Sequence, residues 1–220
     1  MPLRIKSATP SNADPVIDTI VRAFSGDPAA RWFYPDSHRY SEHFPRFVKA
    51  FAGAAFEHGS ADCVDGYSGA ALWLAPGVHP DEKVLVALLE QTICERDRAD
   101  VFRLLDRMNS YHPAEQHWYL PMIGVVPGKQ GNGYGSALLE HALGRCDTDH
   151  KLAYLESSSP KNIPLYERYG FELLGTIQIG SSPPLFPMLR RPRPATGALL
   201  QLDGARVLDA YPLVAINAWR

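Results

Sequence analysis

Apolar side chains recur along the chain at two different spacings. Helical spacing, with apolar residues three or four positions apart, predicts helices over 11–24, 41–58 and 84–108, the last as one helix or two. Short apolar or alternating runs predict strands. The strands are expected over 3–7, 61–64, 69–74, 117–126, 151–156, 171–179 and 187–190, and two short helices over 136–143 and 163–169.

Two residues interrupt the strand expected over 117–126. Pro121 lacks an N–H donor and Gly124 lacks a side chain, so both are poor members of a central ladder. Such residues often mark a bulge, or a place where another part of the backbone approaches closely. We therefore expect an irregular strand at this point.

The C-terminal end is expected to form a segment of its own. Arg191-Pro192-Arg193-Pro194 resembles a linker, because prolines cannot continue a ladder, and this predicts a domain over 1–190 and an extension over 191–220. Within the extension, Asp203-Gly204 lies between apolar runs and predicts a β-hairpin. An isolated hairpin is marginal in water, so it should dock on its own domain or on a second copy in a homodimer.

Composition and charge narrow the classes of function. The formal net charge is −2, which gives no basic face for nucleic acid or for an anionic membrane. The three cysteines are far apart and lack metal-ligand spacing, so we expect neither a bound metal nor a disulfide framework. The N-terminus has no signal-peptide core and no apolar run has the length of a membrane span, which predicts a cytoplasmic protein.

The segment from Ile123 to Ser136 carries the strongest chemical signal. A predicted strand enters a glycine-rich loop, and the loop opens a predicted helix. Gly131, Gly133 and Gly135 let successive backbone N–H groups point into one concavity, and the helix N-terminus adds attraction for anions. The natural guest of such a loop is a pyrophosphate.

A glycine-rich loop alone has other interpretations. It can be a flexible surface turn. It can also belong to a Rossmann dinucleotide site, with Glu156 as the acidic residue about 20 positions on, although the loop lies past the middle of the chain and no repeated βαβ pattern follows. A P-loop is excluded, because that motif needs Gly-Lys-Ser or Gly-Lys-Thr and neither occurs in this sequence.

Two blocks of this sequence together resemble the GNAT family of acetyltransferases. The first, Gln130-Gly131-Asn132-Gly133-Tyr134-Gly135, fits the family pattern Gln/Arg-x-x-Gly-x-Gly/Ala. The second comprises Tyr154-Leu155-Glu156-Ser157-Ser158, Asn162 and Leu165-Tyr166-Glu167-Arg168-Tyr169-Gly170-Phe171. Trp118-Tyr119-Leu120 is similar to the puromycin N-acetyltransferase-like branch. The resemblance covers roughly Leu3 to Arg190.

The resemblance implies an α/β (α+β) fold with a mixed, mostly antiparallel sheet, splayed open between its fourth and fifth strands, with helices on both faces. Acetyl-CoA would lie in that gap as co-substrate. Backbone groups of the strand would hold its pantetheine arm, and amides of the loop its pyrophosphate. The implied contacts are Ile123, Gly124, Val125, Gln130, Gly131, Asn132, Gly133, Tyr134, Gly135, Ser136, Asn162 and Tyr166.

Acetyl transfer needs groups that move protons and hold negative charge. An N–H at a bulge near Val125 could hold the oxyanion, the Tyr166 phenol could protonate the leaving thiolate, and Glu156 could accept the amine's proton. His112 and Glu115 are candidate relays. On the residues alone, Tyr166 fits a packed core aromatic as well, and Glu156 a surface or capping carboxylate.

The sequence therefore predicts an N-acetyltransferase that moves the acetyl group of acetyl-CoA to a primary amine of a small molecule by direct attack in a ternary complex. The alternative is a non-catalytic acyl-CoA-binding or sensor module on the same fold, and a nucleotide-binding oxidoreductase is a third class. No acidic cluster indicates a polyamine site. Aromatic residues that could line a pocket for an apolar or aromatic acceptor occur at Arg31-Trp32-Phe33-Tyr34, Trp73 and Trp118-Tyr119.

Overall fold

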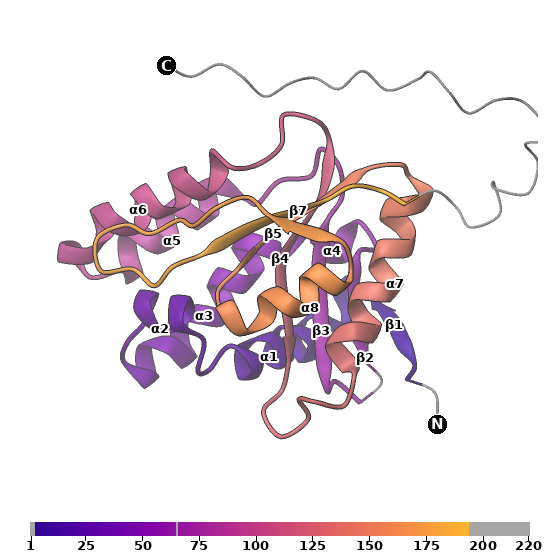
Figure 1. The fold of residues 1–220 in the computed structure, drawn as a ribbon. Helices are drawn as coiled ribbons and strands as arrows, with labels where there is room; N and C mark the ends of the chain where they lie inside the picture. Colours follow the sequence, from indigo (N-terminus) through magenta and orange to yellow (C-terminus); the bar gives the residue numbers. More distant parts are fainter. Residues whose placement is uncertain (1–2, 65, 194–220) are drawn as a thin grey trace, which may run out of the picture.

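Within residues 3–64 and 66–193, which the computed structural model describes, the chain forms one seven-stranded sheet flanked by helices (Figure 1). The strands are β1 (Ile5–Ala8), β2 (Ala61–Val64), β3 (Gly69–Leu74), β4 (His117–Val125), β5 (Leu152–Ser157), β6 (Phe171–Leu173) and β7 (Phe186–Arg190). The helices are α1 (Ala13–Ala23), α2 (Pro28–Phe33), α3 (Ser37–Ala52), α4 (Ala54–Glu57), α5 (Glu82–Thr92), α6 (Glu95–Asn109), α7 (Tyr134–Thr148) and α8 (Ile163–Arg168), with 3-10 turns at Pro10–Asn12 and Pro160–Asn162.

The strand order is β1-β2-β3-β4-β5-β7-β6, and neighbouring strands are antiparallel except for β4 and β5. These two strands run parallel and pair as far as Leu120↔Leu155. Beyond that point β4 follows β3 to Val125, whereas β5 follows β7 to Ser157. The sheet is therefore mixed, mostly antiparallel and splayed between its fourth and fifth strands, which confirms the predicted fold class.

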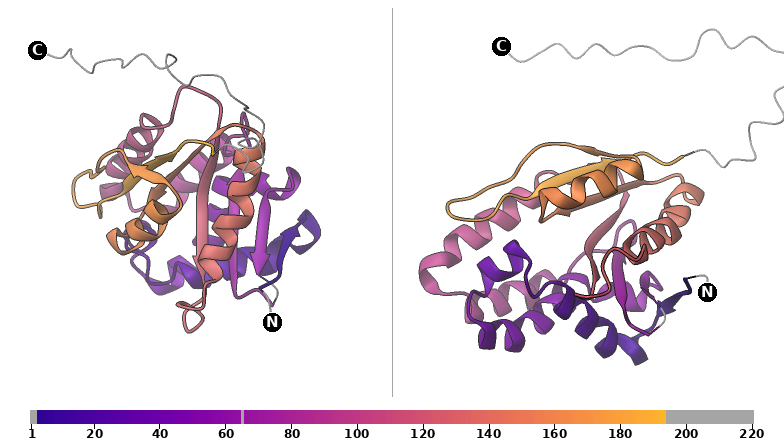
Figure 2. Two further views of the ribbon diagram at one scale, coloured as in Figure 1. Left: turned by 45° about the vertical axis from the view of Figure 1, so that its right-hand side comes forward. Right: turned by 60° about the horizontal axis from the view of Figure 1, so that its bottom comes forward.

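Helices cover both faces of the sheet. Side chains alternate along β4, so that Tyr119 packs on one face while Trp118 and Leu120 pack on the other. The first face carries α1 and α3, and the second carries α7 and α8. In the right-hand view of Figure 2, the indigo and purple helices lie along the bottom and the orange α8 lies along the top. The gap between β4 and β5 thus opens onto two different apolar surroundings.

A row of aromatic rings along α3 fills the first face. Tyr40, Phe44, Phe47 and Phe51 recur at helical spacing, and successive ring centroids lie 4.8, 5.7 and 5.3 Å apart. Phe51 then meets the Tyr119 ring of β4 edge-on, with the centroids 6.2 Å apart. The row runs from the end of α1 to the sheet and forms a wall beside the gap.

Gly124 lets α1 approach β4 closely. A Cβ atom at this position would lie 2.5 Å from the Cβ of Ala23 and 3.3 Å from the ring of Phe24. Real Cβ atoms do not come so near to another side-chain carbon, so a larger residue would push the helix away from the strand. The close backbone approach predicted from Gly124 is confirmed.

A β-bulge lies at Leu120-Pro121. Opposite the stretch from Leu72 to Leu74 on β3, β4 has one residue more than the ladder needs. The irregularity predicted at Pro121 is confirmed. The bulge expected near Val125 is wrong, because Val125 belongs to a regular stretch of the β3–β4 ladder.

Helix α2 is an element that the apolar pattern did not predict. The apolar pattern predicts a helix that ends at Phe24 and no further helix before residue 41, whereas α2 begins at Pro28. Oδ1 of Asp27 accepts the N–H groups of Ala29 and Ala30, each at 3.0 Å, and proline suits the first helical position. Six residues are too few to show a helical period of apolar side chains. The capping residue Asp27 is therefore the main sequence signal for this helix.

The segment after β6 also differs from the prediction. A strand over 171–179 is wrong, because β6 ends at Leu173 and an isolated bridge joins Ile177 to Leu185. Both of these side chains pack on Leu104 of α6. The segment therefore crosses over the helices instead of extending the sheet.

Most of the extension expected over 191–220 lies outside the described residues, as does its hairpin at Asp203-Gly204. In the described ranges, no helix combines the length and the apolarity that crossing a bilayer requires.

Gly124→Ala should destabilise the fold, because the new methyl group overlaps Ala23 of α1. Overpacking of this kind lowers the free energy of unfolding by about 1–3 kcal/mol, measured by urea denaturation. Gly144→Ala is the matched control, since a Cβ there meets no atom within 4 Å and alanine favours the interior of α7. Equal unfolding free energies in the two variants would contradict the close approach.

Candidate active site

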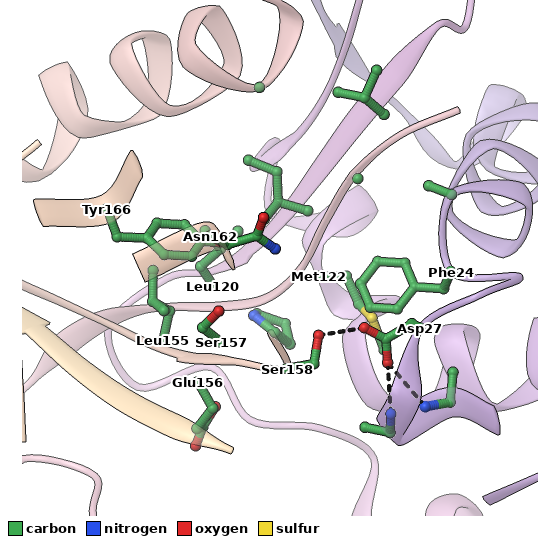
Figure 3. A pocket seen from close by; sticks show the side chains of 18 of the residues that line it. Phe24, Asp27, Leu120, Met122, Leu155, Glu156, Ser157, Ser158, Asn162 and Tyr166 are labelled. Carbon is green, nitrogen blue, oxygen red and sulfur yellow. Dashed lines mark hydrogen bonds between the residues drawn. The ribbon is translucent and has the colours of Figure 1, made fainter. Parts of the chain in front are cut away.

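A cleft of about 600 Å³ occupies the gap where β4 and β5 part. One end lies at the loop between β4 and α7, and the other lies among α2, α3 and α6. The strand ends 121–125 and 155–158 line the middle, which Figure 3 shows from close by. Because the cleft is continuous, ligands entering from its two ends would meet at the strand gap.

The loop end of the cleft is built from backbone groups. Gly128, Gly131 and Gly133 have φ angles of 80°, 78° and 79°, in the left-handed region that favours glycine. Gly135 and Ser136 stand in the first turn of α7, where backbone N–H groups have no helical partner, and both line the cleft. Free N–H groups and the positive end of the helix dipole make this end suited to an anion.

The residues predicted in this loop divide into two groups. Those that line the cleft are Gln130, Gly131, Gly133, Tyr134, Gly135 and Ser136. Asn132 instead donates hydrogen bonds from its side chain to the carbonyl oxygens of Lys129 and Gln130, at 2.9 and 3.2 Å. Asn132 therefore holds the loop together through its side chain and does not line the cleft.

Past the bulge, β4 turns one backbone edge toward the gap. The N–H of Val126 donates to the carbonyl oxygen of Ser68 at 3.0 Å, on the β3 side. Since successive N–H groups of a strand point to alternate sides, the N–H of Val125 points toward the gap. The carbonyl oxygen of Val125 points the same way and accepts a hydrogen bond from the Gln130 side chain at 3.3 Å. An extended ligand could add to this edge as a further strand.

Tyr166 and Asn162 line the cleft from the side of α8. Tyr166 is 6% exposed, and its ring lies edge-on to Phe171 with the centroids 6.0 Å apart. Burial raises the pKa of Tyr166, and the negative charge of Asp27 raises it further. The phenol therefore stays protonated near neutral pH, as a proton donor must.

Glu156 lies in the cleft on the opposite face of β5. Its neighbour Leu155 packs in the same cluster as Tyr166, so strand alternation puts Glu156 on the face of Tyr119 and Tyr154. Figure 3 shows its side chain pointing away from Tyr166. The side chain is 3% exposed, and Oε1 has no hydrogen-bond partner among the described residues. A buried acceptor without a donor indicates a place for a ligand's donor.

A predicted relay stands beside Glu156. Nε2 of His112 lies 3.6 Å from Oε1 of Glu156. Burial raises the pKa of Tyr119 and of Tyr154, and the negative charge of Glu156 adds to both shifts, so these two phenols also stay protonated. Glu115, the other predicted relay, is exposed and does not line the cleft.

Asp27 and Ser158 form a polar contact that the sequence analysis missed. Ser158 donates a hydrogen bond to Oδ2 of Asp27, while the other oxygen of Asp27 caps α2 (Figure 3). The bond joins positions 131 residues apart, at the end of β5 and the start of α2. An acidic residue before Pro28 is a capping signal, but it does not tell which strand the cap will meet.

The far end of the cleft is apolar. Phe33, Phe44, Phe47, Phe51, Leu104, Leu105, Met108 and Leu185 line it. Of the aromatic residues proposed from the sequence, Phe33 and Tyr119 line the cleft, whereas the three tryptophans lie elsewhere. Trp73 is fully buried, Trp32 donates a hydrogen bond to Ser181, and Trp118 donates one to Asp149. Within the described lining the acidic residues are Asp27 and Glu156, and both belong to the strand-gap end.

Residues 80–173 match the sequence profile of a family described as "Acetyltransferase (GNAT) domain". These residues are therefore similar to a GNAT acetyltransferase domain. The matched range holds the glycine loop as well as Glu156, Asn162 and Tyr166. Both sequence blocks on which the resemblance rested therefore fall inside the matched range.

Similar proteins are N-acetyltransferases of the same fold. An uncharacterized N-acetyltransferase of Schizosaccharomyces pombe is 26% identical over 199 residues, which cover 79% of this chain and 77% of the relative. A solved structure described as "histone acetyltransferase HPA2 and related acetyltransferase", from Corynebacterium glutamicum, is 27% identical with a TM-score of 0.61, covering 89% of this chain and 99% of that one.

Arylalkylamine N-acetyltransferase 2 of Aedes aegypti has a TM-score of 0.63 at 12% identity, covering 88% of this chain and 100% of its own. The polyamine N-acetyltransferase of Drosophila melanogaster, which forms N-acetylagmatine, has a TM-score of 0.61 at 12% identity, covering 86% and 99%. At this identity the two likenesses show the fold alone. With the domain match and the nearer relatives, the protein is an acyl-CoA-dependent acetyltransferase of the GNAT fold.

Proposed function

We propose that the protein transfers the acetyl group of acetyl-CoA to a primary amine of a small molecule, by direct attack in a ternary complex. The observation that carries this proposal is one continuous cleft that joins an anion-binding loop, an open strand edge and an apolar pocket. Coenzyme A has matching parts in the same order: a pyrophosphate, an extended arm with two amides, and a thioester at its end.

Acetyl-CoA would lie along the free edge of β4. The pyrophosphate would accept hydrogen bonds from the amides of the first turn of α7, at Gly135 and Ser136. The pantetheine amides would pair with the backbone of Ile123 and Val125, beside Gly124, and Asn162 would reach the arm from α8. The Gln130 amide would leave the carbonyl of Val125 or share it with the incoming arm.

The chemistry would use Glu156 and Tyr166 in separate roles. Glu156 takes a proton from the amine, and the neutral nitrogen attacks the thioester carbon. As the N–C bond forms, the oxyanion accepts a hydrogen bond from the N–H of Val125. The C–S bond then breaks, and the thiolate takes a proton from the Tyr166 phenol. The second proton that the substrate nitrogen loses returns to the tyrosinate through water, so that each turnover leaves one net proton on Glu156. None of the three cysteines lines the cleft, so the acetyl group passes directly to the amine.

The position of Glu156 supports catalysis over a binding-only role. Oε1 of the buried Glu156 has no hydrogen-bond partner among the described residues, and leaving a buried acceptor unpaired costs about 1–3 kcal/mol. A module that only held acyl-CoA would gain nothing from this cost. Glu156 also lies on the opposite face of β5 from Tyr166. The group that accepts the amine's proton and the group that protonates the thiolate are therefore kept apart.

The acceptor would carry its amine on an apolar or aromatic body. The far end of the cleft is lined by aromatic and aliphatic side chains, and its acidic groups lie at the acetyl end. One ammonium can therefore reach Glu156, but a second one on the same molecule would lie against Phe47 and Met108 with no partner. A branch specificity like that of puromycin N-acetyltransferase, a homodimer and a cytoplasmic location stay predictions of the sequence.

Gly135→Val should weaken acetyl-CoA binding at least about tenfold, or 1.4 kcal/mol, measured by calorimetry. A Cβ at 135 makes only ordinary contacts at 3.9 Å, so the larger branched side chain would enter the cleft without straining the fold. Gly133 is a poorer site for this test, because its φ of 79° would strain any branched residue. Gly144→Ala is the control, and unchanged affinity with normal circular dichroism would sink the loop assignment.

Tyr166→Phe should lower turnover by about 10²-fold or more, because it removes the proton donor of the thiolate and keeps the ring that packs on Phe171. The affinity for acetyl-CoA should stay within about twofold of wild type, since the change is small. Release of coenzyme A followed with a thiol reagent measures the effect. Full activity in Tyr166→Phe would assign the proton to water or to another group.

An amine panel should favour one class of acceptor. We expect kcat/KM for 2-phenylethylamine to exceed that for putrescine or spermidine at least tenfold, because burying the ring gains about 1.5–3 kcal/mol while burying a second ammonium costs free energy. Met108→Glu, which adds a carboxylate at the far end, should narrow or reverse this preference, with Met108→Gln as the uncharged control. Preference for the diamine in the wild-type enzyme would contradict the assignment.

A further inference from the structure

A chain of close contacts leads from Glu156 to the surface through two histidines. Nε2 of His112 lies 3.6 Å from Oε1 of Glu156, and Nδ1 of His112 lies 3.0 Å from Nε2 of His117. Nδ1 of His117 lies 2.8 Å from the backbone oxygen of Glu115, in a loop whose residues 114–116 are exposed. Three consecutive contacts therefore join a buried carboxylate in the cleft to a solvent-exposed turn.

The last contact decides the tautomers of both rings. A carbonyl oxygen can only accept, so the Nδ1 of His117 carries a hydrogen. In the neutral ring, Nε2 of His117 is then an acceptor, and Nδ1 of His112 must donate to it. Nε2 of His112 is left with a lone pair that faces Glu156.

This arrangement accounts for the contact at Glu156. An ionised carboxylate and an imidazole lone pair have no hydrogen to share, which fits the 3.6 Å separation and the orphaned Oε1. Once Glu156 holds a proton, it becomes a donor and Nε2 of His112 is ready to accept. Each donor in this chain therefore points outward, from Glu156 to His112 and from His112 to His117, so a proton can move out of the cleft.

Several charged and titratable groups surround the pair. The ring of His112 lies between Tyr119 of β4 and Tyr154 of β5, with centroids 4.5 and 4.4 Å away. His79 and Glu156 act on His117 through their charges, and Tyr111 acts on Tyr154. Burial lowers the pKa of His117 despite its bond to Glu115, so this ring is neutral at pH 7 and can receive a proton.

The reaction makes such a path necessary. An ammonium substrate and acetyl-CoA give an amide, a thiol and one proton, so each turnover leaves a proton with the base. Glu156 is 3% exposed and cannot hand this proton readily to bulk water while the cleft is filled by substrates. The side chain of His112 is 23% exposed and His117 is half-buried, so both rings are better solvated than Glu156.

We propose that His112 and His117 are a proton relay that resets Glu156 after each transfer. This inference rests on the proposed function, with Glu156 as base. Protonated Glu156 gives its proton to Nε2 of His112, whose Nδ1 proton passes to Nε2 of His117. His117 then loses its Nδ1 proton to water at the exposed 114–116 turn, which leaves the hydrogen of each ring on Nε2. Proton exchange with water at the two part-exposed rings returns these hydrogens to Nδ1 before the next turnover. The histidines act through Glu156, so they are positioning and relay residues that do not touch the acetyl group.

The tautomers can be read without any turnover. Nitrogen-15 NMR of imidazole-labelled full-length protein at pH 7.5 should show both rings neutral with the hydrogen on Nδ1. The opposite tautomer at either ring would overturn the relay, because the outward acceptor at His112 would be lost. This NMR measurement needs no amine substrate. A failure of the relay can therefore be told apart from a failure of the proposed function.

The kinetic arm uses 2-phenylethylamine at saturating acetyl-CoA. His112→Phe keeps a packed ring and removes both nitrogens, so kcat should fall about tenfold or more, less than for direct loss of a general base. The solvent isotope effect on kcat should rise, because proton removal becomes slower, and the affinity for acetyl-CoA should not change. His117→Gln should act in the same direction.

Controls separate the relay from packing. In His112→Ala, added imidazole should restore part of the lost kcat, which a purely structural loss would not allow. His38→Phe, at a side chain 85% exposed on α3, should behave as wild type. Unchanged kcat and an unchanged solvent isotope effect in both His112→Phe and His117→Gln would overturn the proposal. Wild-type protein that releases no coenzyme A with any amine would refute the proposed function instead.

Discussion

The parting of β4 and β5 beyond Leu120 is the constraint on which the site depends. Had the parallel ladder continued, the N–H and C=O groups of Ile123 and Val125 would have been used up within the sheet. The bulge at Leu120-Pro121 ends that pairing, and Gly124 lets α1 hold the far half of β4 on its own side. β5 meanwhile follows β7. What remains is a strand edge inside a cleft, which a ligand with amides of its own can complete.

The same gap gives the protein two chemically different faces to work with. Because side chains alternate along β5, Leu155 faces the cluster of Tyr166, whereas Glu156 faces the tyrosines and His112. A protonated phenol and a buried carboxylate can then serve one reaction from two sides. In the proposed mechanism, the proton taken by Glu156 would leave through His112 and His117, so it would not have to cross to the Tyr166 side.

The apolar end of the cleft is assembled from segments that meet only in the folded chain. The aromatic row of α3 supplies one wall and α6 supplies another. In the segment after β6, Leu185 packs with Leu104 of α6 and also lines the cleft. Asp27 connects this end to the strand gap, since its carboxylate caps α2 and accepts the Ser158 hydroxyl at the end of β5. The Asp27–Ser158 hydrogen bond therefore connects the start of α2 to the chain two residues after Glu156.

The sequence by itself determined the features that are local. Glycines at 131, 133 and 135 predicted the anion loop, and Pro121 and Gly124 predicted an irregular β4, because backbone conformation depends on neighbouring residues. Tertiary structure alone decided what depends on distant pairing: the bulge lies at Leu120-Pro121 instead of Val125, and residues 174–179 leave the sheet to pack on α6. Likewise, no local pattern could join His112 and His117 to Glu156, because parallel pairing of β4 with β5 brings them together across some 40 residues of intervening chain.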